Sequence, residues 1–108
     1  MRGADLTGAI LHQVNLISAD LRGVDLTRAD LRKADLMRVN LEGADLTEVD
    51  LSEAHLFRVN LRGANLKGAN LKGANFKLVF LTDAYLSETD LTDVELSPSF
   101  FEMPLESE

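Results

Sequence analysis

The sequence predicts an all-β fold, a four-sided solenoid in which four repeats of five residues make each coil. From Leu6 to Leu96 every fifth residue is leucine except Phe76, which gives nineteen consecutive central positions. Outward-facing residue types also recur at intervals of twenty residues. Nineteen repeats at four per coil predict just under five coils.

Each repeat has a small residue, then Asp or Asn, then the central residue and two variable residues. The small residue is alanine eleven times, valine seven times and threonine once, and Asp or Asn occupies its position in fourteen of the nineteen repeats. A helix would scatter residues five apart around its circumference, and a flat strand would point successive leucines to opposite faces. We therefore expect a short extended piece, with the small and central residues inward, followed by a corner.

The corners carry their own pattern. All seven glycines occupy the second position after a central residue, where a tight turn often needs φ > 0. Asp and Asn side chains can accept hydrogen bonds from nearby backbone amides and so support the same turns.

The length of one coil follows from outward residues that recur. If coils stack, similar residues should form columns along the tube. Four sets recur at a spacing of twenty: Gly3, Gly23, Gly43 and Gly63; Thr7, Thr27 and Thr47; Arg22, Glu42 and Arg62; and Ile17, Met37 and Phe57. Spacings of fifteen or twenty-five give no comparable set.

These repeats resemble the pentapeptide repeat family, whose A(D/N)LXX units are represented here by Ala64-Asn65-Leu66-Lys67-Gly68. The resemblance covers residues 4 to 96 or so, and it implies a right-handed quadrilateral β-helix. The handedness comes from the family. The departures from the pattern are local: Ile10, His55, Phe80, Tyr85 and Glu95 replace Asp or Asn, and Thr89 replaces Ala or Val.

The two ends of the repeat run differ. We expect residues 1–97 to form the β-helix and residues 98–108 a C-terminal capping tail, because both prolines and four large apolar residues gather there. The first repeat is already in register and has no such cover. An exposed first coil would favour a homodimer or end-to-end stacking, and whether the chain is a segment of a longer one stays open.

Composition excludes several classes of function. The net charge is −7, which disfavours direct binding to nucleic acid or to an anionic membrane. There is no cysteine, so disulfides and thiolate metal sites are excluded. No apolar run approaches the ~20 residues of a membrane span, and no secretory signal is recognisable, so we expect a cytoplasmic protein.

We expect no enzymatic activity, no cofactor and no metal site. His12 and His55 lie forty-three residues apart on different outward columns, too far for paired ligation on one element. The stacked aspartates of a convex tube are expected to be hydrated. The serines and threonines sit mainly at corners, where they support turns.

The leading hypothesis is a non-enzymatic solenoid that acts as a protein-binding or scaffold module of unknown biological role. Its candidate binding surface is an apolar stripe rimmed by arginine. The stripe comprises Ile17, Met37, Phe57, Leu78, Phe80, Arg38 and Arg58. The alternative for these residues is a ladder whose side chains only stack on one another.

The resemblance implies a second function. Some pentapeptide repeat proteins protect DNA gyrase from inhibitors and are interpreted as acidic mimics of duplex DNA. In this chain residues 1–77 carry a net charge of +1 and residues 78–108 a net charge of −8. Because the acidity is not spread along the tube, this DNA-mimic hypothesis is the alternative.

Overall fold

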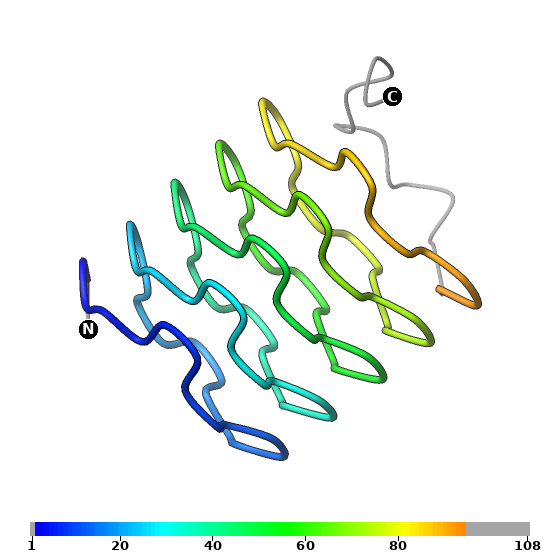
Figure 1. Ribbon diagram of the computed structural model, residues 1–108, viewed down its shortest axis with the longest axis horizontal. Helices are drawn as coiled ribbons and strands as arrows, with labels where there is room; N and C mark the ends of the chain where they lie inside the picture. The colour runs from blue at the N-terminus through cyan, green and yellow to red at the C-terminus, as the bar shows by residue number, and fades with distance from the viewer. Residues whose placement is uncertain (1, 95–108) are drawn as a thin grey trace.

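The computed structural model describes residues 2–94, which coil into a four-sided tube with its two ends at opposite poles (Figure 1). Each repeat contributes one β-bridge residue. Fourteen parallel bridges join described residues that are twenty apart, from Asp5–Asp25 to Asn70–Asp90. Because the chain turns after every bridge, residues 2–94 contain neither a helix nor a strand longer than one residue.

The four sides of the tube are numbered by their order along the chain. Face 1 holds residues 4–8, 24–28, 44–48, 64–68 and 84–88, and face 2 holds residues 9–13, 29–33, 49–53, 69–73 and 89–93. Face 3 holds residues 14–18, 34–38, 54–58, 74–78 and 94. Face 4 holds residues 2–3, 19–23, 39–43, 59–63 and 79–83.

The corners are tight turns with a positive φ at the third residue, as in a type II turn. In the first repeat the N–H of Ala9 donates to the carbonyl of Leu6 at 3.0 Å, and Gly8 between them has φ +70°. All nineteen residues at this position, from 3 to 93, have φ between 57° and 71°. Twelve of them carry side chains, so glycine marks the corners but is not required at each one.

The preference for Asp or Asn follows from the hydrogen bonds of the backbone. In the repeat 24–28, four of the five N–H groups donate to backbone carbonyls, one within the turn and three in the adjoining coils. The fifth, the N–H of Thr27, donates to Oδ1 of Asp25 at 3.0 Å. The same bond is formed by all fourteen Asp and Asn residues at this position, from Asp5 to Asp90, so in these repeats the side chain before the central residue accepts the one N–H that has no backbone acceptor.

The central and small residues form one continuous apolar core. In the part of the chain described, no polar or charged residue is buried, and the core residues from Leu21 to Leu86 are at most 6% exposed. The departure at Thr89 is accommodated because its hydroxyl donates to the carbonyl of Leu66 at 3.0 Å. Leu6, Leu11 and Leu16 of the first coil are only partly buried, since they pack against a coil on one side.

The predicted capping tail, residues 98–108, and the repeat before it lie outside the described residues, so the cap and the boundary at residue 97 stay predictions. Between residues 2 and 94 there is no helix with the length and apolar character needed to cross a membrane.

Candidate functional site

Face 3 brings most of the predicted stripe together. The N–H of Ser18 donates to the carbonyl of Met37, and the N–H of Arg38 to that of Phe57, both at 2.9 Å. Ile17, Met37 and Phe57 therefore follow one another on successive coils, about 4.8 Å apart. Ile17 is 37% exposed, whereas Met37 and Phe57 are half-buried. This arrangement leaves an apolar column on the outside of the tube.

Cationic side chains line the same column. Arg38 and Arg58 occupy the corner position that follows Met37 and Phe57, and the guanidinium of Arg58 lies 5.4 Å from the centroid of the Phe57 ring. That distance is within the range of a cation–π contact. Lys77 continues the column one coil above Phe57, since the N–H of Arg58 donates to its carbonyl at 3.1 Å.

The last two stripe residues are divided by a corner. Leu78 lies above Arg58 on face 3, half-buried, with φ +57°. Phe80 is on face 4, where it bridges to Asn60 and is 38% exposed. The guanidinium of Arg62 lies 4.5 Å from the centroid of its ring. Six of the seven stripe residues thus share face 3, and Phe80 lies on the adjoining face.

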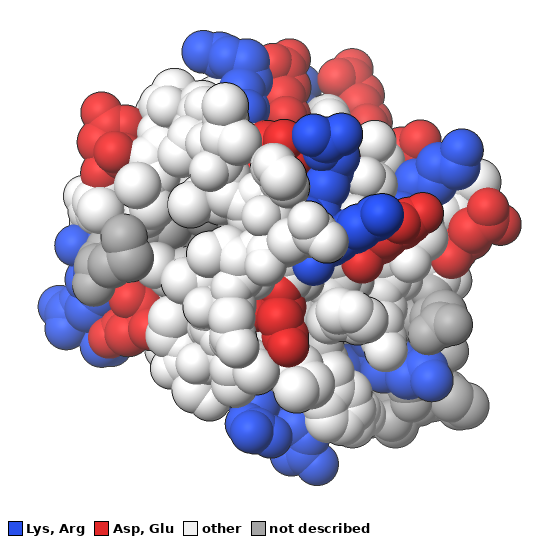
Figure 2. Space-filling model, turned by 90° about the horizontal axis from the view of Figure 1, so that it is seen from below, with Lys and Arg blue, Asp and Glu red and all other residues white. Residues whose placement is uncertain are grey.

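The four faces differ in charge. Among the described residues, face 1 has two bases and five acids, face 2 three bases and five acids, and face 4 three of each. Face 3 has three bases, Arg38, Arg58 and Lys77, against one acid, Asp35. The net charges of faces 1 to 4 are therefore −3, −2, +2 and 0. Figure 2 shows both signs intermixed on one side of the molecule.

The faces also differ in how their cations are paired. Arg22 and Arg32 each form a salt bridge with the aspartate two residues earlier, at 2.7 and 2.8 Å. Arg28 and Lys33 lie 3.9 Å from glutamates one coil above. Within residues 2–94 the three cations of face 3 form no ion pair, and neither do Lys67 of face 1 and Lys72 of face 2. Sequence reasoning missed this net positive face and the place of Lys77 in it, although sorting the charges by the twenty-residue spacing would have found both.

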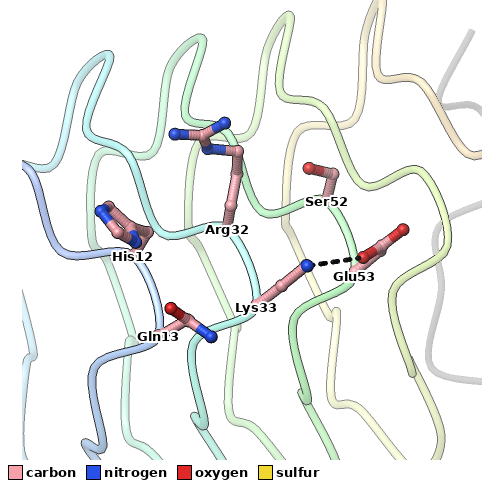
Figure 3. Close-up of a pocket in the computed structure, with 6 residues that line it drawn as sticks. All are labelled: His12, Gln13, Arg32, Lys33, Ser52 and Glu53. Carbon is pink, nitrogen blue, oxygen red and sulfur yellow. Dashed lines mark ion pairs between the residues drawn. The ribbon is translucent and has the colours of Figure 1, made fainter.

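A shallow hollow lies on face 2, lined by His12, Gln13, Arg32, Lys33, Ser52 and Glu53 (Figure 3). Its volume of ≈ 500 Å³ would admit a small molecule. However, Arg32 is held by Asp30 at 2.8 Å and Lys33 lies near Glu53, so their charges are already countered. The side chain of His12, which also lines the hollow, is exposed, so no buried polar group is aimed at a ligand there.

Several carboxylates of residues 2–94 have a lowered pKa. The guanidiniums of Arg22 and Arg32 lower the pKa of Asp20 and of Asp30 to about 2. A threonine hydroxyl donor likewise lowers the pKa of Asp25 and of Asp90. These shifts hold the carboxylates in their charged form, which suits ion pairs and turns rather than a general acid. The described residues contain no cluster of three metal-ligating side chains.

A comparison with models of protein families shows the family of this chain. A family model described as pentapeptide repeats matches in eight copies, over residues 1–36, 34–73 and 54–93. The chain belongs to the pentapeptide repeat family. Proteins of this family form right-handed quadrilateral β-helices, which agrees with the four-sided tube. No curated protein sequence matches the chain.

Solved pentapeptide repeat proteins resemble the chain in fold and in sequence. The protein alr5209 of Nostoc Pcc 7120 is 38% identical, with a TM-score of 0.75, over 86% of this chain and 84% of its own. Rfr23 of the cyanobacterium Cyanothece 51142 is 39% identical, with a TM-score of 0.69, over 87% of this chain. This chain spans 60% of the Rfr23 chain. AT2G44920, a pentapeptide repeat protein of the Arabidopsis thaliana thylakoid lumen, is 34% identical, with a TM-score of 0.66, over 90% of this chain and 71% of its own.

Proposed function

We propose that this pentapeptide repeat chain is a non-enzymatic protein-binding module whose binding surface is face 3. Proteins of the family are generally structural or binding modules. The tube is convex, and its interior is filled by leucine and alanine or valine side chains, so the outer faces are the surfaces available to a partner. A cytoplasmic location stays a prediction.

The observation that carries the proposal is the coincidence of two features on one face. Face 3 holds the outward apolar column of Ile17, Met37 and Phe57, and it alone among the described faces has a net positive charge. Apolar residues rimmed by arginine are typical of protein interfaces. The three cations beside the column form no ion pair within residues 2–94, so they are available to carboxylates of a partner.

A site-specific crosslinking experiment tests the proposal. A photo-crosslinking phenylalanine analogue at Met37 should capture a cellular protein, whereas the same analogue at Thr27 should not. Thr27 is the matched control because it occupies the same position of its repeat, in the same coil, on face 1. Capture should be lost when Phe57→Ser is added, with a melting temperature within a few degrees of the parent. Equal capture from both positions, or capture from neither, would contradict the proposal.

The DNA-mimic alternative receives no support from the described surface. Faces 1 and 2 are acidic, yet they carry bases in the second and fourth coils, and faces 3 and 4 are not acidic. A mimic of a phosphate backbone would need a more continuous acidic surface. A gyrase supercoiling assay decides the alternative, and inhibition by a modest molar excess of the protein would revive it.

A further inference from the structure

We infer that the partner of face 3 is an acidic amphipathic helix that lies along the axis of the tube. The inference rests on the proposed function and adds the chemistry and the shape of the partner. It follows from the charge of face 3 and from the spacing of its apolar column.

The charge of face 3 selects for carboxylates. Arg38, Arg58 and Lys77 rise along three consecutive coils, and among the residues of this face up to 94 only Asp35 opposes them. A partner with carboxylates beside its apolar residues would meet cations that form no ion pair within residues 2–94. Arginine can also bind a carboxylate through two parallel hydrogen bonds, which fixes orientation as well as charge.

The spacing of the column selects for a helix. Successive coils place Ile17, Met37 and Phe57 about 4.8 Å apart along the tube. Side chains on one face of a helix recur about every 5.4 Å, so residues at i, i+4 and i+7 stay near three successive rungs. Side chains on one face of an extended strand recur at roughly 6.7 Å and fall out of step by the second rung.

A second copy of the chain fits less well. Its own face 3 is positive and would repel the first, while its acidic faces 1 and 2 lack an apolar column in the middle coils. The corresponding column of face 1 is Thr27, Thr47 and Lys67, and that of face 2 is Arg32, Ser52 and Lys72. A segment of another protein that combines apolar residues with glutamates would bring both negative charge and apolar contacts. No single face of a second copy provides the two together.

Peptide binding to the full chain tests the inference. The probe is a fluorescent synthetic peptide of about four helical turns, with leucines at i, i+4, i+7 and i+11 and glutamates flanking them. The control peptide has lysine in place of every glutamate. Fluorescence anisotropy should detect binding of the glutamate peptide and at least tenfold weaker binding of the lysine peptide, and added salt should reduce the difference.

Charge reversal on the protein locates the peptide. The double variant R38E/R58E should lower the affinity of the glutamate peptide at least tenfold. The control variant K67E/K72E makes the same change of charge on faces 1 and 2. It should change the affinity less than threefold. The variant R38E/R58E should fold, because Glu48 and Glu53 already occupy the same corner position in their repeats at φ near +57°. R38Q/R58Q gives a milder second variant whose affinity should fall between the other two, and glutamine is accepted at this corner, as Gln13 at φ 60° shows.

Several results would overturn the inference. One is no binding of the glutamate peptide, and another is an equal loss of affinity in R38E/R58E and K67E/K72E. A rise in peptide affinity when the four glutamates of residues 95–108 become glutamine would assign the face to the chain's own C-terminal segment. A dimer that R38E/R58E dissociates would assign it to a second copy. Crosslinking from Met37 without peptide binding would remove the acidic helix and leave the proposed function standing.

Discussion

The first coil and the middle coils have the same repeat but different burial. Leu46 and Leu66, in the third and fourth coils, are 0% exposed, whereas Leu6, at the equivalent position of the first coil, is only partly buried. Its turn and its bridge are nevertheless the same, with Gly8 at φ +70° and Asp5 bridged to Asp25.

This comparison separates what the repeat provides from what stacking provides. The turn, the side-chain hydrogen bond and the inward direction of the leucine belong to a single repeat, since the first coil has them all. Complete burial requires a coil on both sides, as in other solenoids whose units contact only their neighbours. Substitutions of matched residues in the two regions should therefore differ in size.

The largest expected difference is at the central leucines. Leu46→Asp places a carboxylate among apolar side chains with no partner, and we expect the cooperative unfolding transition to disappear. Leu6→Asp should lower the melting temperature but leave a cooperative transition, because its carboxylate can reach water at the end of the tube. Thermal denaturation followed by circular dichroism measures both. Equal effects would show that stacking does not control burial.

An intermediate difference is expected at two glycines of face 1. Gly8→Ala and Gly68→Ala both place a Cβ at φ near +70°, which costs about 1–2 kcal/mol. The new Cβ at position 8 meets nothing within 4 Å, but at position 68 it lies 3.2 Å from Cγ of Glu48 in the coil below. Gly68→Ala should therefore be the more destabilising, by about 1 kcal/mol.

Urea denaturation measures the two free energies of unfolding. Repeating both substitutions in a Glu48→Ala background provides the control, since it removes the crowding atom. The two values should then converge. A persistent difference would mean that the contact with Glu48 is not its cause.

The smallest expected effect is the response to acid of the coils nearest the N-terminus. Arg22 and Arg32 lower the pKa of Asp20 and of Asp30 to about 2 in the folded chain. The stabilisation from these carboxylates is complete above their ordinary pKa near 3.9, and it is lost as the pH falls through about 2. We therefore expect the free energy of unfolding to decrease slightly between pH 4 and pH 2.

The variant D20N/D30N isolates this effect. Asparagine keeps the oxygen that accepts the N–H of residues 22 and 32, as Asn40 does for Glu42 at 3.1 Å, but it cannot form the ion pair. Unfolding of the variant should depend less on pH than unfolding of the parent chain. An identical pH dependence would place the acid-sensitive groups in other coils.

Much of the fold can be predicted from the sequence because the residue types within each repeat indicate which side chains face inward and where the chain turns. The inward position of the central residues is confirmed from Leu6 to Leu86, whereas Leu91 is 38% exposed at the end of the described residues, and the parallel bridges have the spacing of twenty that the outward columns indicate. Glycine predicted seven corners, but nothing in Leu78 indicates φ +57°. That conformation is imposed by the neighbouring coils and not by the preference of the residue. Likewise, the bond from Thr89 to the carbonyl of Leu66 joins residues too far apart for a repeat pattern to reveal.

The candidate site is less predictable, since it depends on what several repeats share. Six stripe residues fall on face 3 because the spacing of Ile17, Met37 and Phe57 equals one coil. The pairing of the cations required the structure. It shows that Arg22 and Arg32 bind aspartates of their own repeats, whereas Arg38 and Arg58 form no ion pair within residues 2–94 and Arg58 lies over the ring of Phe57. Whether a partner binds there stays a prediction.

The twenty-residue coil has a consequence for how such a chain can change in length. Inserting one five-residue unit after residue 43 would advance every later residue by a quarter turn, so Phe57 would leave the column of Met37 and appear on face 4. Inserting four units would add one coil, about 4.8 Å along the axis of the tube, and keep every later residue on its original face. The chain can thus lengthen by twenty residues at a time without changing its faces. An insertion of any other length separates the residues of a surface that several coils form together. Residues of different coils therefore stay in the same column only when whole coils are inserted or removed.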